Sequence, residues 1–259
     1  MVLLSGVILA VPVLYSQGIS AVRTDVGAER IAEDTLHISR IIAILLLISY
    51  AVYVFFQVRS HHGIYDAIFE HDEERDQDGQ EDLAKAKLTL TECIIGLIIS
   101  VALVSILAVT LVLQIEPVIE QGHVSDAFMG LILVPLVEKF AEHLTAIDEA
   151  WDNQMNFALS HVLGATLQTA LFNAPLAIVV GWGLGKNIDL NFDLFTIVML
   201  LLSILTVGRF LQDQKSNYFE GFLLVITYVA VAVAAFYIPD PAHAAGGEGG
   251  SGEGGASHE

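Results

Sequence analysis

The chain has 259 residues, of which 54% are hydrophobic and only 16% are charged. This composition is too apolar for an ordinary soluble domain and is typical of a helical protein with several membrane spans. The formal net charge of −19 argues against nucleic acid and anionic lipid headgroups as partners. The single cysteine, Cys93, excludes an intramolecular disulfide and a cysteine-based zinc site. We therefore expect a protein that is embedded in the lipid bilayer.

Seven hydrophobic segments are candidates for membrane spans, each of which needs about 20 residues. The first, 2–15, is short, and we expect it to be a spanning helix that lacks its beginning. It has no basic region before it and therefore does not resemble a signal peptide. Mixed charges over 16–40 indicate a polar connection, and the second segment, 41–58, follows between Arg40 and Arg59.

An acidic linker over 66–82 separates the second segment from the third. Arg75 is its only basic residue, and such a run buries too little apolar surface to become ordered. We expect the linker to be solvated and mobile, with a cation-attracting or regulatory loop as the alternative. The third segment covers 92–115, and Pro117 is expected to end it because proline disrupts a helix.

The fourth segment, 124–149, carries charges that a spanning helix rarely holds. These are Glu138, Lys139, Glu142, His143, Asp148 and Glu149. At helical spacing, Glu138, Glu142 and Glu149 share one face, and Lys139 and His143 form a neighbouring stripe. Charge at membrane depth indicates a functional site facing a protein interior or a water-filled cavity. The alternative is that the span ends before these charges and they lie in a solvated helix.

The fifth segment, 157–182, has small and polar residues where leucines are expected. They include Gly164, Ala165, Thr166, Gln168, Thr169, Asn173 and Pro175. Small residues let helices approach closely, and hydroxyl and amide oxygens are the ligands that hard divalent cations prefer. Pro175 is expected to break or kink the helix and expose carbonyl oxygens. A tight helix crossing without a ligand is the alternative.

The remaining segments, 192–210 and 218–238, are predicted to be packing helices, and the tail after Pro239 is too rich in Gly, Glu and Ser to form a core. His143, next to Glu142, adds a proton argument because imidazole titrates near neutral pH. A carboxylate that binds either a cation or protons is the simplest element for antiport. The alternative is that His143 is an interfacial residue bonded to the backbone. His61, His62, His123 and His161 are interpreted as interface residues.

Four stretches together resemble a known family, the vacuolar cation/proton exchangers of the calcium/cation antiporter superfamily, especially its fungal members. The stretches are ISRIIAILLLISYAVYVFFQVRSH, VPLVEKFAEHLTAI, LGATLQTALFNAPLAIVVGW and KSNYFEGFLLVITYVAVAVAAFY. The resemblance implies an all-α polytopic bundle, built from a sodium/calcium exchanger-like repeat of five helices and two preceding spans. It also implies that the chain is divided into four parts. These are the end of a first repeat over 1–60, the acidic linker over 61–91, a second repeat over 92–238 and a disordered tail over 239–259.

Two family motifs assign candidate site residues by resemblance. Residues 138–143 align with Gly-Asn-Ala-Ala-Glu-His, and Glu138 and Lys139 replace the Gly-Asn pair. Residues 164–168 align with Gly-Ser-Ser-x-Gln. The resemblance implies that Glu142 and Gln168 bind the metal ion and that Glu142 also carries the proton. His143 would modulate protonation, and Thr166, Glu138 and Thr169 would be further candidates.

The function implied by the resemblance is a calcium, or other divalent cation, to proton antiporter. It would move cytosolic Ca²⁺ into an acidic, vacuole-like compartment, with Ca²⁺ and H⁺ as transported ions and no cofactor. Phosphate-binding loops, nucleophile elbows and zinc-spaced histidine pairs do not occur in the sequence, so we do not expect an enzyme. Expected partners are the bilayer and either a second copy of the chain or a separate first half. The alternative function is an incomplete or non-transporting membrane subunit that pairs with a complete exchanger.

Overall fold

The computed structural model describes residues 1–23, 25–74, 76, 79, 87–122, 124–212, 215 and 217–238. Over these residues the chain forms helices and turns and no strand. The predicted disordered tail, most of the second half of the acidic linker and His123 lie outside the described residues. The chain divides into two compact units, which are treated separately below. Unit 1 comprises Met1–Ala84 and Phe140–Glu220, and unit 2 comprises Lys85–Lys139 and Gly221–Glu259.

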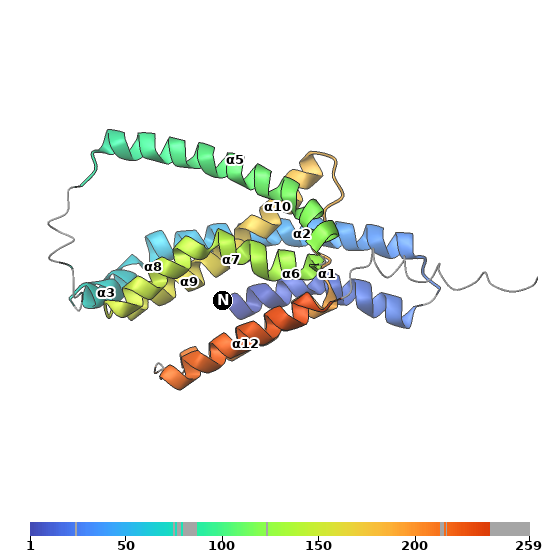
Figure 1. The fold of residues 1–259 in the computed structure, drawn as a ribbon. Helices are drawn as coiled ribbons and strands as arrows, with labels where there is room; N and C mark the ends of the chain where they lie inside the picture. The colour runs from blue at the N-terminus through green and yellow to red at the C-terminus, as the bar shows by residue number, and fades with distance from the viewer. Residues whose placement is uncertain are drawn as a thin grey trace, which may run out of the picture. The chain divides into compact units, whose positions relative to one another are not determined.

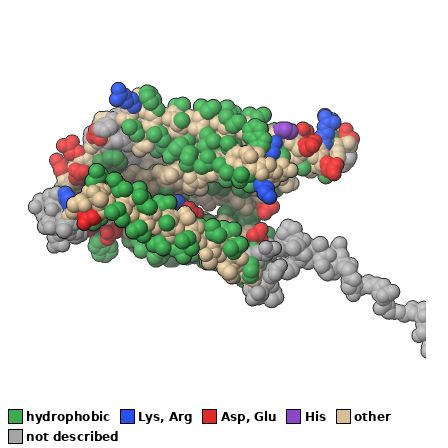
Figure 2. All heavy atoms as spheres, turned by 90° about the horizontal axis from the view of Figure 1, so that it is seen from above, with side chains coloured by type: hydrophobic (Ala, Val, Ile, Leu, Met, Phe, Trp, Pro, Cys, Tyr) green, Lys and Arg blue, Asp and Glu red, His purple; other side chains and the backbone are tan. Residues whose placement is uncertain are grey.

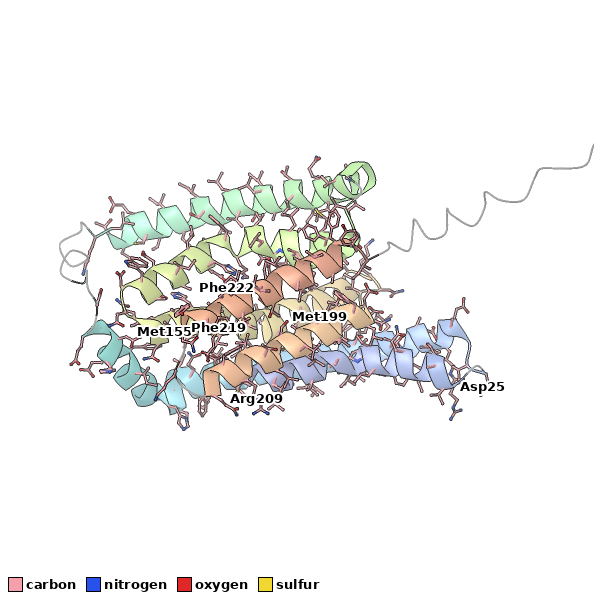
Figure 3. The ribbon with its side chains drawn as sticks, turned by 60° about the horizontal axis from the view of Figure 1, so that its bottom comes forward. Asp25, Met155, Met199, Arg209, Phe219 and Phe222 are labelled. Carbon is pink, nitrogen blue, oxygen red and sulfur yellow. The ribbon has the colours of Figure 1, made fainter. Side chains whose placement is uncertain are left out.

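Unit 1 begins with a hairpin of two long helices, α1 (Val2–Val22) and α2 (Ala28–Phe55). Figure 3 shows Asp25 in the turn between them, at the opposite end of the unit from Met155. The predictions of a short first segment and of a polar connection over 16–40 are wrong, because both helices extend into that region. In α2 the buried residues Ile31, Thr35 and Ser39 recur every four positions, which is the spacing of one helix face.

A rod of 29 residues, from Met155 to Gly183, runs through unit 1. It consists of α9 (Met155–Gln168), the wide π-helical turn η3 (Thr169–Asn173) and α10 (Ala174–Gly183). Pro175 does not end this helix, contrary to one of the two predicted outcomes. A proline lacks an N–H and clashes with the carbonyl four residues earlier, and the wider turn before Pro175 gives that carbonyl room.

The core of unit 1 lies where the rod meets α1, α2 and α11 (Leu194–Gln212). Its buried members are Leu9, Ala10, Val13, Ile42, Ala43, Leu46, Leu167, Leu171, Ile178, Leu190 and Ile197. Gly6 permits the close packing of α1 against α11, because a Cβ at this position would lie 2.9 Å from Cδ1 of Ile204.

The chain continues from α2 through the wide turn η1 (Phe56–Ser60) into α3 (His62–Glu73). The first part of the acidic linker is therefore helical, and the prediction of a solvated, mobile segment is wrong for 66–73. This helix is held in place because Asp72 is buried and because α3 packs against the start of α9. The two helices meet at one end of the rod (Figure 1).

Unit 2 contains the longest helix, α5 (Leu90–Gly122). Thr89 and Glu92 form a capping box at its start, in which the Thr89 N–H donates to Glu92 Oε2 at 2.8 Å. The prediction that Pro117 ends this helix is wrong, because α5 continues to Gly122. Shorter helical pieces follow as α6 (Asp126–Phe128), η2 (Met129–Leu133) and α7 (Val134–Glu138).

The helix α12 (Tyr218–Phe236) enters unit 2 at Gly221. Its end is fixed there by Ser125, whose hydroxyl donates to the Ala235 carbonyl oxygen at 2.6 Å and accepts from the Phe128 N–H at 3.1 Å. The rings of Phe128 and Phe236 pack edge to face, with centroids 5.4 Å apart.

Six helices of the described chain are long and apolar enough to cross a membrane. They are Val2–Val22, Ala28–Ser60, Leu90–Ile115, Met155–Gly183, Leu194–Gln212 and Tyr218–Phe236. Figure 2 shows hydrophobic side chains covering most of the helix surfaces, with charged side chains mainly near helix ends. The fourth of the seven expected spans, 124–149, is instead divided at Lys139, whose backbone leaves the helical region at φ −94° and ψ 7°. The predicted all-α membrane fold is confirmed.

Candidate functional site

The helix that follows Lys139, α8 (Phe140–Trp151), forms a hairpin with α9. The turn between them is tight because Asn153 adopts a positive φ of 69°, which asparagine tolerates better than most residues. The Gln154 N–H donates to the Glu149 carbonyl oxygen at 2.8 Å and closes the turn. The two helices therefore run antiparallel and lie side by side (Figure 1).

One side-chain contact fixes the register of this hairpin. Nδ1 of His161 on α9 lies 2.9 Å from the carboxylate of Glu149 on α8. Glu142 precedes Glu149 by seven residues, and Gln168 follows His161 by seven. Seven residues are close to two helical turns, so each pair shares one helix face. Glu142 lies seven residues further from the turn than Glu149, and Gln168 lies seven residues further from it than His161. Because the helices are antiparallel, Glu142 and Gln168 are at the same level on the two helices.

The hairpin thus places the two residues that the sequence assigns as metal ligands at one level on adjacent helices. His143 and Thr166 lie on the same two helices, and the side chains of all four residues are exposed. The hydroxyl of Thr166 donates to the Val162 carbonyl oxygen at 2.8 Å, so its oxygen keeps lone pairs for a cation. Thr166 lies two residues from Gln168, about 200° around the axis of α9, so it does not share the face of Gln168. The site assignments stay predictions.

Glu138 lies before the helix break and belongs to unit 2. Its Oε1 lies 3.4 Å from Nζ of Lys139, so the two residues that replace the family's Gly-Asn pair form an ion pair. A lysine that neutralises a carboxylate reduces its attraction for a cation. The ion pair with Lys139 therefore weakens the case for Glu138 as a cation ligand.

The hairpin alone does not form a complete cation site. Among the residues that the structure describes, no group of three or more His, Cys, Asp or Glu side chains is arranged to hold a metal ion. The carboxylate of Glu142 and one oxygen from Gln168 supply part of a coordination shell, whereas Ca²⁺ takes about six to eight oxygens. Further oxygens must come from other groups or from water.

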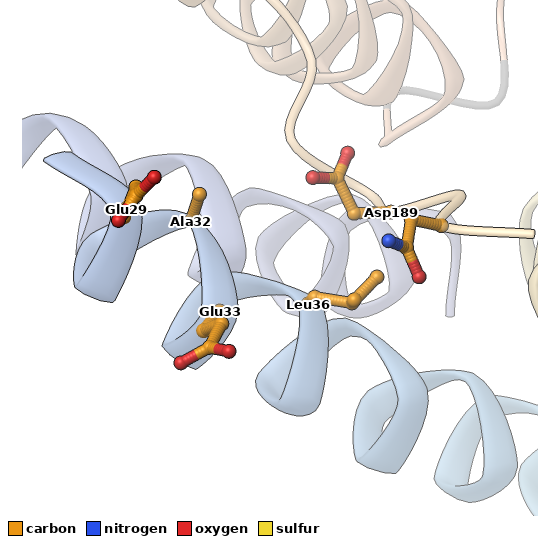
Figure 4. A pocket seen from close by; sticks show the side chains of 6 residues that line it. Glu29, Ala32, Glu33, Leu36 and Asp189 are labelled. Atoms are coloured by element: carbon orange, nitrogen blue, oxygen red, sulfur yellow. The ribbon is translucent and has the colours of Figure 1, made fainter.

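A separate hollow of about 480 Å³ lies between α2 and the loop after α10 (Figure 4). It is lined by Glu29, Ala32, Glu33, Leu36, Asn187 and Asp189. None of the predicted site residues lines this hollow.

Sequence reasoning missed the contact between Glu149 and His161 and assigned His161 only to an interface. The sequence does contain a pattern that indicates this contact. His161 precedes Gln168 by seven residues, and Glu142 precedes Glu149 by the same number. Sequence reasoning also missed Asp72, whose carboxylate accepts a hydrogen bond from the N–H of Asn156 at 2.7 Å. No local pattern links residues so far apart in the chain.

Comparison with known proteins shows a match to the family described as sodium/calcium exchanger protein over residues 93–237. Vacuolar cation/proton exchanger 2 of Arabidopsis thaliana is 36% identical over 206 residues, covering 80% of this chain and 46% of that protein. The vacuolar calcium ion transporter of Schizosaccharomyces pombe is 34% identical, covering 79% of this chain and 48% of that protein. The chain spans about half the length of these relatives.

The solved structure of native YfkE matches 90% of this chain and 62% of its own chain, with a TM-score of 0.65 and 24% sequence identity. This likeness concerns the fold alone. Together with the family match, it confirms the predicted exchanger-like helical fold.

Proposed function

We propose that this chain, which belongs to the sodium/calcium exchanger protein family, forms one side of the transport site of a membrane cation/proton antiporter. Its cargo is Ca²⁺ or a similar divalent cation, carried from the cytosol into an acidic, vacuole-like compartment while protons move the other way. The names of the relatives, vacuolar cation/proton exchangers and a vacuolar calcium ion transporter, support this cargo and location.

The observation that carries the proposal is the register of the α8–α9 hairpin. The contact between Glu149 and His161 supports a common level for Glu142 and Gln168 on adjacent helices. A carboxylate and an amide oxygen at one level are suited to a hard cation, which prefers oxygen ligands.

The exchange follows from the chemistry of one carboxylate. The deprotonated Glu142 binds the cation together with Gln168. In the acidic compartment a proton takes the place of the cation on Glu142, and protonation removes the charge that attracted it. The proton leaves again on the cytosolic side, where its concentration is lower. The two ions exclude each other at one site, so their movements are coupled.

The test is proton-gradient-driven uptake of radioactive calcium into vesicles that contain the full 259-residue chain. Uptake is expected to require the gradient and to be abolished by Glu142→Gln, which keeps the size of the side chain but removes its charge and proton. The control is Asp148→Asn, because Asp148 is an exposed carboxylate on the same helix but six residues away and therefore on another face.

Full uptake by the Glu142→Gln variant would refute the role of this carboxylate. No uptake by a wild-type chain that is shown to be inserted and folded would refute transport by this chain acting alone. That second result would favour a subunit that works with a further protein.

A further inference from the structure

The carboxylate of Asp72 on α3 is almost fully buried, with 2% of the residue's surface exposed. Its Oδ2 accepts hydrogen bonds from the backbone N–H groups of Asn156 at 2.7 Å and Phe157 at 3.1 Å. Its Oδ1 accepts a third bond from Nδ2 of Asn156 at 2.8 Å. A buried carboxylate is costly unless it is hydrogen-bonded, and these three donors satisfy that requirement.

The two backbone donors belong to the first turn of α9, whose N–H groups have no acceptor within their own helix. Gln154 stands at the capping position but makes no capping bond with its side chain. Asp72 therefore supplies from another helix the cap that the sequence around Gln154 does not provide. Its negative charge is also favourable at the positive end of the helix dipole.

A second contact on the same face of α3 reinforces the first. The ring of Phe69, three residues before Asp72, stacks on the ring of Phe157 with centroids 4.5 Å apart and an interplanar angle of 21°. The neighbouring acidic residues Glu70 and Glu73 are exposed. The acidic helix is thus attached to α9 by one specific carboxylate and one ring.

The attachment has a mechanical consequence because α3 continues from α2. Along its length α2 packs against α10 and η3, whereas α3 packs against α9. One continuous segment therefore holds the rod on both sides of its wide turn. Thr166 and Gln168 lie between the two attachments, just before η3.

We propose that Asp72 is a positioning residue for the cation site. By holding the start of α9, it fixes the position of the α8–α9 hairpin, which carries Glu142 and Gln168, relative to α2 and α10. Without Asp72, the hairpin loses the hydrogen-bonded part of its attachment to α3, while α10 stays attached to α2. This inference rests on the proposed function for its effect on transport, but its structural part can be measured without transport.

The test compares Asp72→Asn with Glu73→Gln in the full chain in lipid vesicles. Both variants remove one negative charge from α3, but only the first removes the buried cap. Hydrogen exchange of the α9 amides is expected to accelerate by about tenfold or more in Asp72→Asn, from Asn156 as far as Gln168. The KM for calcium is expected to rise by about tenfold while the maximal rate changes little, because misplaced ligands weaken binding. Glu73→Gln is expected to resemble the wild type in both measurements.

Asn156→Ala provides a milder variant in case Asp72→Asn does not fold. It removes only the third hydrogen bond and is expected to change both measurements in the same direction by a smaller amount. Faster exchange that stays confined to the first turn of α9 would overturn the positioning role, even in a chain that does not transport. Faster exchange along the whole of α9 with an unchanged KM would also overturn it and would leave the proposed function standing. Loss of all transport in the wild type would count against the proposed function alone.

Discussion

The hydroxyl oxygen of Ser39 on α2 accepts a hydrogen bond from the backbone N–H of Leu190 at 3.0 Å, and both residues are buried. This bond joins α2 to the loop between α10 and α11. Ser39→Ala would leave the Leu190 N–H buried without its acceptor. We expect a loss of about 1 to 3 kcal/mol in the free energy of unfolding, measured by thermal or denaturant unfolding in detergent.

Ser49→Ala is the matched control for that prediction. Ser49 lies on the same helix, but its hydroxyl is exposed and donates to the Leu45 carbonyl oxygen of its own helix. Its removal is expected to change stability by less than about 0.5 kcal/mol. Equal effects of the two substitutions would show that the bond to Leu190 contributes nothing specific.

The amide of Gln168 is predicted to supply one oxygen to the cation. Gln168→Leu keeps the approximate size of the side chain and removes that oxygen, so the KM for calcium is expected to rise about tenfold or more. Gln17→Leu makes the same chemical change at an exposed position of α1 and serves as the control. Calcium uptake measured over a range of concentrations checks this prediction, and an unchanged KM for Gln168→Leu would remove Gln168 from the site.

The turn between α8 and α9 depends on the positive φ of Asn153. Asn153→Val is expected to destabilise the protein by about 1 to 2 kcal/mol, because a β-branched side chain is strained in this conformation. Asn153→Gly is expected to retain stability, since glycine adopts positive φ without strain. The unfolding midpoints of the two variants in detergent test this prediction. Similar losses of stability in both variants would argue against backbone strain as the cause.

The contact between Glu149 and His161 is partly exposed, with 51% of the histidine side chain accessible. A double-mutant cycle with Glu149→Gln and His161→Gln is expected to give a coupling energy of about 0.2 to 1 kcal/mol, the range found for exposed pairs. The cycle uses the unfolding free energies of the two single variants and the double variant. Additive effects would mean that the pair does not stabilise the hairpin.

Long apolar segments made most of the membrane helices predictable, because a span needs both length and hydrophobicity. The polar starts of helices were not predictable from hydrophobicity alone. Residues 28–40 form a helix because Ile31, Thr35 and Ser39 bury one face, a pattern in which two of three members are polar. Capping boxes at Thr89 and Asn217 mark the starts of two helices in the sequence. A prediction from the length of apolar segments alone does not include such signals.

Residues of the candidate site were identified from spacing and resemblance, and their common level follows from the hairpin. The sequence could not show that Lys139 interrupts the helix, because Lys139 itself and its neighbours Glu138 and Ala141 are good helix formers. It also could not show that Asp72 caps α9, because that bond depends on the path of the chain between two distant segments. Contacts of this kind arise from tertiary packing and leave no periodic signal in the sequence.

The wide turn η3 divides the rod into two helical segments, α9 and α10. The number of residues in η3 sets how far α10 is rotated about the helix axis relative to α9. Removing one residue from Thr169–Asn173 would leave a continuous helix but rotate everything beyond it by about 100°. A single-residue gap between relatives at this point therefore marks a change in which face of α10 meets α2, rather than a shorter loop. The half of the rod that carries Gln168 and the half that packs against α2 can in this way diverge independently during evolution.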